Sequence, residues 1–291
     1  MALPLSRYVY GTTRLGDDSI PFEDRVAIAR EAIGRGLSLH TSHQYGDALS
    51  VIRAALDADR SVEPPFVFKI GWSDAEEIRD QVRLQLDALG IERLAVGQLC
   101  LGGPIAESLA ANGPEIDDLL AMRDEGLVGE FVLEAWPWTS ETLLSGLRRG
   151  AVDRLEAGFI FYLNPLQRFV TNELWSELRS RETTIVAMRT VGGGSPSPSG
   201  PEYLAARAAE VRPIFARSGI ASWTEFCVRY ALGYGQVAAT VGATARASAL
   251  EEFTAATDSA APLDPAIVAE IEALHRRWSD EHDRSAAPWS M

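Results

Sequence analysis

The segment LSLHTSHQYGDALSVIRAAL, residues 37–56, decides the fold, because it contains the unit that recurs along the chain. Its first residues are typical of a β-strand, the middle ones of a tight loop and the last ones of an α-helix. His40, His43 and Tyr45 lie within six residues where the strand meets the loop. Two histidines and a tyrosine at the end of a strand raise the question of which chemistry needs them there.

The same order of elements repeats through the sequence. Helical stretches, such as residues 23–36 and 76–90, carry apolar residues on one face and end at glycine. Between the helices lie short apolar runs: RYVYG, LSLHTS, PFVFKIG, RLAVGQLCLG, GEFVLEAW, GFIFYLNP, TTIVAMRTV and VAATVGA. This alternation predicts parallel strands joined by crossover helices. Eight such units in 291 residues favour an α/β fold of the (β/α)8 TIM-barrel type. The first turn, YGTTRLGDD, lacks the GxGxxG pattern typical of a doubly wound dinucleotide-binding sheet.

We expect residues 1–291 to form a single domain, with a C-terminal helix over residues 264–278 packed on the barrel. Asp264 is suited to cap this helix and Pro265 to occupy its first turn. The segment GGGSPSPSGP, residues 192–201, is interpreted as a mobile loop over the barrel mouth. The alternative, a linker between two domains, is disfavoured because the helix and strand pattern resumes beyond it.

The composition excludes several classes of partner. With 41 acidic and 27 basic residues the formal net charge is −14, which disfavours binding to nucleic acid or to an anionic membrane surface. No apolar run is long enough to span a membrane, and the first residues do not resemble a signal peptide. Cys100 and Cys227 do not indicate a disulfide framework. We therefore expect a cytoplasmic protein that acts on a small molecule, and the oligomeric state is left open.

In a barrel of this type the chemistry lies at the carboxyl ends of the strands. Polar or titratable residues occupy those ends here: His40, Tyr45, Lys69, Cys100, Glu134 and Arg189. Each has a structural alternative. His40 could be a hydrogen-bonded core residue, Cys100 a small buried apolar residue, and Arg189 the partner of a surface carboxylate. Close burial of such groups would perturb their pKa values, as in catalytic acids and bases.

Lys69 carries the strongest signal, since it is the only lysine among the 27 basic residues. It lies in the middle of an apolar strand, where a solvated cation is not expected and a buried one needs a partner. Lysine also offers a movable proton, which arginine does not. We therefore predict that Lys69 is functional.

Taken together, the motifs resemble those of the aldo-keto reductase family. GTTRLG resembles its opening strand and turn, LHTSHQYG its catalytic tyrosine segment and FVFKIG its catalytic lysine strand. LGIERLAVGQLCLGG, RDEGLVGEFVLEA, YLNPLQR and VGATARASALEEF follow in the family's order, so that the resemblance covers about residues 7–255. It implies a TIM barrel of the aldo-keto reductase type that reduces carbonyl groups with NADPH, and a tetrad of Asp, Tyr, Lys and His. Tyr45 would be its proton donor, with a pKa lowered by Lys69.

The chain departs from the family pattern at half of the tetrad, where His40 replaces the aspartate and Cys100 the histidine. Contacts to the nicotinamide and its phosphates also differ: Glu134, Ala135, Ile160, Leu163, Ala243, Ala249 and Phe253 stand at the family's cofactor positions. Thr244 and Arg246 would remain for a phosphate. Since each lost hydrogen bond weakens binding, these departures predict that no cofactor is used.

Three functions follow from this sequence. The first is a repurposed enzyme without a cofactor that performs acid–base chemistry, such as isomerisation, dehydration, cyclisation or lyase chemistry, on a carbonyl-containing or aromatic metabolite. The second is an NADPH-dependent carbonyl oxidoreductase with a divergent site, and the third a non-catalytic binding or regulatory subunit. In the first, Glu134 would pair with Lys69 in place of the missing aspartate, and Cys100 would be an alternative base as a thiolate.

Residues for substrate binding are also expected at the mouth of the barrel. Trp72, Trp136 and Trp138 lie at or just beyond strand ends, where they could enclose an aromatic substrate or simply pack at the rim. We list Trp72, Trp136 and Arg189 as substrate-binding residues. No metal site is expected, because Lys69 would repel a cation held by His40, Cys100 and Glu134.

Overall fold

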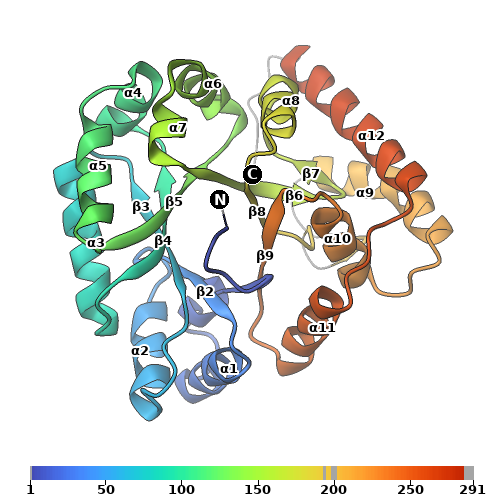
Figure 1. Cartoon of the computed structure of the whole chain (residues 1–291). Coiled ribbons are helices and arrows are strands. Elements are labelled where there is room, and N and C mark those ends of the chain that lie inside the picture. The colour runs from blue at the N-terminus through green and yellow to red at the C-terminus, as the bar shows by residue number, and fades with distance from the viewer. Residues whose placement is uncertain (1, 193–194, 198–201, 285–291) are drawn as a thin grey trace.

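The computed structural model describes residues 2–192, 195–197 and 202–284. Eight parallel strands close into a barrel because β5 pairs with both β4 and β6. The helices form an outer layer around it (Figure 1). The barrel strands are β1 (Tyr8–Gly11), β2 (Ser38–Thr41), β3 (Phe66–Gly71), β4 (Leu94–Cys100), β5 (Val128–Glu134), β6 (Gly158–Asn164), β8 (Ile185–Met188) and β9 (Val237–Ala243). The predicted (β/α)8 barrel is confirmed, and each strand lies within one of the eight predicted runs except β5, which begins one residue earlier, at Val128.

The remaining elements connect or cover these strands. A short antiparallel strand, β7 (Gln167–Arg168), pairs with the end of β6. Two 3-10 helices, η1 (Thr13–Gly16) and η2 (Pro137–Thr139), follow β1 and β5. The α-helices are α1 (Phe22–Gly34), α2 (Ala48–Ala58), α3 (Ala75–Leu89), α4 (Gly103–Ala111), α5 (Glu115–Asp124), α6 (Ser140–Arg149), α7 (Ala151–Leu155), α8 (Asn172–Ser180), α9 (Glu202–Arg217), α10 (Trp223–Leu232), α11 (Ala247–Asp258) and α12 (Pro265–Arg284).

Local sequence explains where the helices begin and end, as α3 illustrates. The Asp74 side chain accepts a hydrogen bond from the Glu77 backbone N–H, which caps the first turn. Ile78 and Val82 are buried on one face. Gly90 then ends the helix in the left-handed conformation, at φ 62°, which glycine adopts without strain.

Side chains that alternate along the strands make two cores. One fills the barrel and consists mainly of β-branched residues, among them Val9, Val67, Val96, Val132 and Val186. The larger one lies between the strands and the outer helices. Towards the carboxyl ends of the strands, the polar side chains of His40, Gln98 and Glu134 replace aliphatic ones at the site.

The C-terminal helix is longer than predicted. It follows Asp264, as expected, but runs to Arg284 instead of ending at residue 278. The added turns keep contacts that favour the helix: Asp280 accepts a hydrogen bond from Asn172, and Arg277 pairs with Glu281 one turn later. Parts of the predicted mouth loop, residues 193–194 and 198–201, lie outside the described residues, as do residues 285–291 of the predicted domain. In the described ranges, no helix is long and apolar enough to cross a membrane.

Candidate active site

The candidate active site is a cavity of about 460 Å³ at the carboxyl ends of the barrel strands. Backbone near the ends of β1 and β9 forms part of its wall. The side chains that give it chemical character are His40, Tyr45, Lys69, Tyr162 and Arg189. The structure therefore brings the strand-end residues of distant segments to one place, as expected for this barrel.

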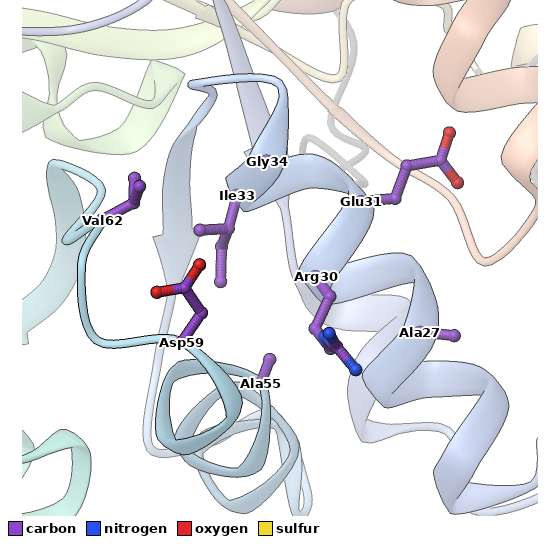
Figure 2. Close-up of a pocket in the computed structure, with 8 residues that line it drawn as sticks. All are labelled: Ala27, Arg30, Glu31, Ile33, Gly34, Ala55, Asp59 and Val62. Carbon is purple, nitrogen blue, oxygen red and sulfur yellow. The ribbon is translucent and has the colours of Figure 1, made fainter.

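A second hollow of about 480 Å³ lies on the outside of the barrel, between α1 and α2 (Figure 2). Ile33 and Ala55 form its apolar part, and Arg30 and Asp59 stand at its edge. The Glu31 side chain points away from Asp59. These groups come from the outer faces of two helices rather than from strand ends, so we do not assign chemistry to this hollow.

An ion pair between Lys69 and Glu134 forms the charged centre of the site. The Lys69 Nζ lies 3.2 Å from Glu134 Oε1, and the two side chains are 19% and 3% exposed. Desolvation acts to lower the pKa of Lys69, but Glu134 and the neighbouring Tyr45 and Cys100 together raise it above its ordinary value. Lys69 is therefore a cation, and its counter-ion comes from β5 across the cavity.

Gln98 links this pair to His40. Gln98 Nε2 donates to Glu134 Oε1 at 2.7 Å, and Gln98 Oε1 lies 2.6 Å from His40 Nε2. Because the amide nitrogen donates to Glu134, the amide oxygen is an acceptor, and His40 carries its proton on Nε2. Burial, with help from the Lys69 charge, lowers the pKa of His40 to about 4. His40 is thus neutral at pH 7, whereas His43 is exposed on the loop.

Tyr45 and Lys69 both line the cavity, and the Lys69 charge acts on the Tyr45 phenol. Burial raises the pKa of Tyr45 more than the Lys69 charge lowers it, so the net shift is upward. Lys69 lowers the pKa of Tyr45, as predicted, but desolvation of the phenolate outweighs the attraction of the cation. Tyr45 is a neutral phenol that can donate a proton.

Two glycines place Tyr45. A Cβ on Gly16, at the end of η1, would lie 1.9 Å from the Tyr45 carbonyl oxygen. Gly46 has φ +54°, and a Cβ there would lie 2.6 Å from the Gly16 carbonyl oxygen. The loops after β1 and β2 therefore touch through their backbones, and only residues without a side chain permit that approach.

Cys100 is buried at the end of β4 and does not line the cavity. Burial, followed by the charge of Glu134, raises the pKa of its thiol far above the ordinary value. The alternative in which Cys100 acts as a thiolate is therefore wrong. The thiol donates to the Gln98 carbonyl oxygen, 3.9 Å from Cys100 Sγ.

Aromatic side chains pack behind Tyr162 at the cavity. Tyr162 lines it and contacts Trp136 edge-on, with ring centroids 4.9 Å apart. Trp136 stacks on Trp138 at 5.5 Å, and Phe169 packs against all three rings. Trp136 is buried, whereas Trp138 is 54% exposed. We refer to Trp136, Trp138, Tyr162 and Phe169 as the aromatic wall.

Two strand ends have strained backbones. Arg189, directly after β8, and Trp72, directly after β3, have φ values of 51° and 62°. Side chains other than glycine pay roughly 1 kcal/mol for this conformation, and such strain is common at functional sites. Arg189 lines the cavity, whereas Trp72 is largely exposed and lies against Gly102. The structure therefore places Arg189 at the site and Trp72 on its rim, away from the cavity lining.

The structure also identifies residues that sequence reasoning missed. Leu163 faces the helices, and it is its neighbour Tyr162 that faces the cavity. Strand alternation from Ile160, which faces inward, would have indicated Tyr162. The same alternation places the side chains of Gln98 and Cys100 on one face of β4.

Thr244 and Arg246 follow β9 and precede α11. Among the described residues, no group of three or more metal-ligating side chains could hold a metal ion.

Comparison with known proteins gives a likeness of structure only. No protein-family model and no curated protein matches the sequence. An aldo-keto reductase from Bacillus halodurans in its holo form superposes with a TM-score of 0.71 at 19% identity, over 94% of this chain and 95% of that one. An aldo-keto reductase from Klebsiella pneumoniae in complex with NADPH gives 0.70 at 16% identity, over 94% and 92%. A Klebsiella pneumoniae enzyme in complex with NADP and acetate gives 0.68 at 17% identity, over 94% and 92%.

These structures correct one prediction. The sequence departures predicted that no cofactor is used, yet proteins with the same fold along almost the whole chain hold NADPH or NADP. The prediction failed because it counted individual side-chain contacts and gave no weight to the shape of the barrel mouth. The resemblance found in the sequence is confirmed at the level of architecture: the chain has the aldo-keto reductase fold along nearly its whole length.

Proposed function

We propose that the protein is a nicotinamide-dependent oxidoreductase that reduces a carbonyl group, with Tyr45 as the proton donor. One observation carries this proposal: a neutral tyrosine lies in the cavity together with a lysine whose charge is balanced by a buried carboxylate. The likeness to structures that contain NADPH or NADP supports the redox character.

Each residue has a defined task in this proposal. Tyr45 gives its hydroxyl proton to the carbonyl oxygen as negative charge develops there. Lys69 stabilises the phenolate that remains, and Glu134 keeps Lys69 charged and in place. Gln98 and the neutral His40 orient Glu134 through their hydrogen bonds. Glu134 thus takes the place of the family's aspartate, from β5 instead of β2.

The residues near β9 suit the phosphates of such a cofactor. Helix α11 begins after Arg246, has no acidic residue in its first turn and has no side-chain cap, which leaves its positive end open to an anion. No ion pair between described residues involves Arg246. Thr244 and Arg246 would hold the phosphates. When bound, the cofactor supplies a hydride.

Tyr45→Phe tests the proton donor. We expect loss of NADPH-dependent aldehyde reduction by about 10²–10⁴-fold, the size typical of general acid catalysis, with an unchanged Kd for NADPH. Absorbance of NADPH measures turnover and protein fluorescence measures binding. Tyr203→Phe is the matched control, since Tyr203 lies on α9 outside the cavity lining, and it should retain turnover. Full activity of Tyr45→Phe, or failure of the wild type to bind NADPH, would contradict the proposal.

A further inference from the structure

The cavity has a net positive charge although the protein is acidic. Lys69 is balanced by Glu134, and His40 and Tyr45 are neutral at pH 7. No aspartate or glutamate is among the described residues that line the cavity. The guanidinium of Arg189 is therefore left as an uncompensated charge, in a protein whose formal net charge is −14.

Arg189 is held in a fixed position. Its carbonyl oxygen accepts hydrogen bonds from the Asn164 side chain at 3.0 Å and from the Gly192 N–H at 2.8 Å, which stabilise the left-handed backbone. Its guanidinium lies over the Tyr162 ring, 5.3 Å from the centroid. None of the ion pairs that join described residues includes it. A stacked guanidinium keeps its N–H edges free, and these match the two oxygens of a carboxylate.

The aromatic wall begins at the same tyrosine. Tyr162 lines the cavity, and its ring contacts Trp136, which stacks on the exposed Trp138 outside the cavity lining. The cavity therefore combines a proton donor at Tyr45, a cation at Arg189 and the ring of Tyr162 beside that cation.

We propose that the substrate is an aldehyde or ketone that carries a carboxylate, and that Arg189 binds this carboxylate while Tyr45 faces the carbonyl. The inference rests on the proposed function and deepens it by naming the substrate class. A competing role for Arg189 is to bind a cofactor phosphate, and the experiment separates the two.

The experiment compares 4-carboxybenzaldehyde with its methyl ester, which keeps the ring and the aldehyde but has no charge. For the wild type we expect kcat/KM for the acid to exceed that for the ester by about tenfold or more, as for charge-assisted hydrogen bonds. Arg189→Met should bring the ratio close to one and leave the Kd for NADPH within about twofold. Arg189→Lys should give an intermediate ratio, since lysine keeps the charge but not the two-point geometry. Arg83→Met, at an exposed arginine on α3, is the control and should change neither quantity.

Three results would overturn the inference. The first is equal kcat/KM of the wild type for the acid and the ester, and the second is an unchanged ratio of these two values in Arg189→Met. The third is weaker NADPH binding by Arg189→Met with the preference for the acid retained. Should the wild type neither bind NADPH nor reduce either compound, the proposed function fails, and calorimetry of the two compounds still tests Arg189. Tighter binding of the acid, lost in Arg189→Met, would then support the anion site, and equal binding would overturn it.

Discussion

Glu134 illustrates how one residue sets the charge of the whole site. Its carboxylate pairs with the Lys69 ammonium and accepts a hydrogen bond from the Gln98 amide. The Glu134 side chain is almost fully buried. Its loss would leave a cation without a counter-ion in a site largely closed to water. We therefore expect a change at Glu134 to affect stability and activity together.

We predict that Glu134→Gln lowers the free energy of unfolding by about 3 kcal/mol. This value is the lower end of the range for a broken buried ion pair, because the Lys69 side chain lines the cavity and is not fully buried. Turnover should fall by about tenfold or more, since an ammonium without its counter-ion loses its proton more readily. Urea unfolding and steady-state kinetics measure the two effects. Glu130→Gln, on the same strand, is the control; a Glu134→Gln variant with wild-type turnover would remove Glu134 from the mechanism.

At the scale of elements, the contact between the loops after β1 and β2 decides where Tyr45 lies. We predict that Gly16→Ala destabilises the protein by about 1–3 kcal/mol, as overpacking does, because the new methyl group would overlap the Tyr45 carbonyl oxygen. Turnover should fall further than stability alone explains, since the displaced loop carries the proton donor. Thermal unfolding and kcat measured well below the melting temperature separate the effects.

Gly34→Ala is the matched substitution for this element. A Cβ at Gly34 meets nothing within 4 Å, and the residue lies in the last turn of α1. Alanine there should be neutral or stabilise by up to about 1 kcal/mol. Equal behaviour of the two variants would show that the loop contact does not position Tyr45.

At the scale of the whole molecule, buried histidines make stability depend on pH. The pKa of His40 is lowered to about 4 by burial, and burial lowers that of His275 well below its usual value. The unfolded chain binds protons at these residues near pH 6.5, whereas the folded one does not. Their contribution is therefore fully present above pH 6.5 and is lost as the pH falls from 6.5 towards 4.

We predict that the free energy of unfolding falls by up to about 3 kcal/mol for His40 alone across this interval, as the linkage relation requires. Urea titrations at several pH values between 7.5 and 4.5 measure the slope. His40→Gln, whose amide can still donate to Gln98, should flatten it. A slope that is identical in the variant would show that His40 does not titrate on unfolding.

The order of strands and helices was predictable because it is encoded locally. Apolar runs such as FVFKIG mark strands, and the helices between them carry apolar residues on one face. A parallel barrel surrounded by helices buries both the strands and these apolar helix faces. A single lysine in an apolar strand was a second local signal, and it pointed to the cavity. The end of α12 was missed because its last turns depend on contacts with other helices.

The sequence by itself determined the barrel and the residues at its strand ends, since period and position along a strand carry that information. Only the tertiary structure decided the charge state of the site. Whether the pKa of Tyr45 lies above or below its ordinary value depends on the balance between desolvation and the attraction of Lys69, and desolvation prevails. That balance, the bridge through Gln98 and the free charge of Arg189 arise from distances between residues far apart in the chain, which no local pattern records.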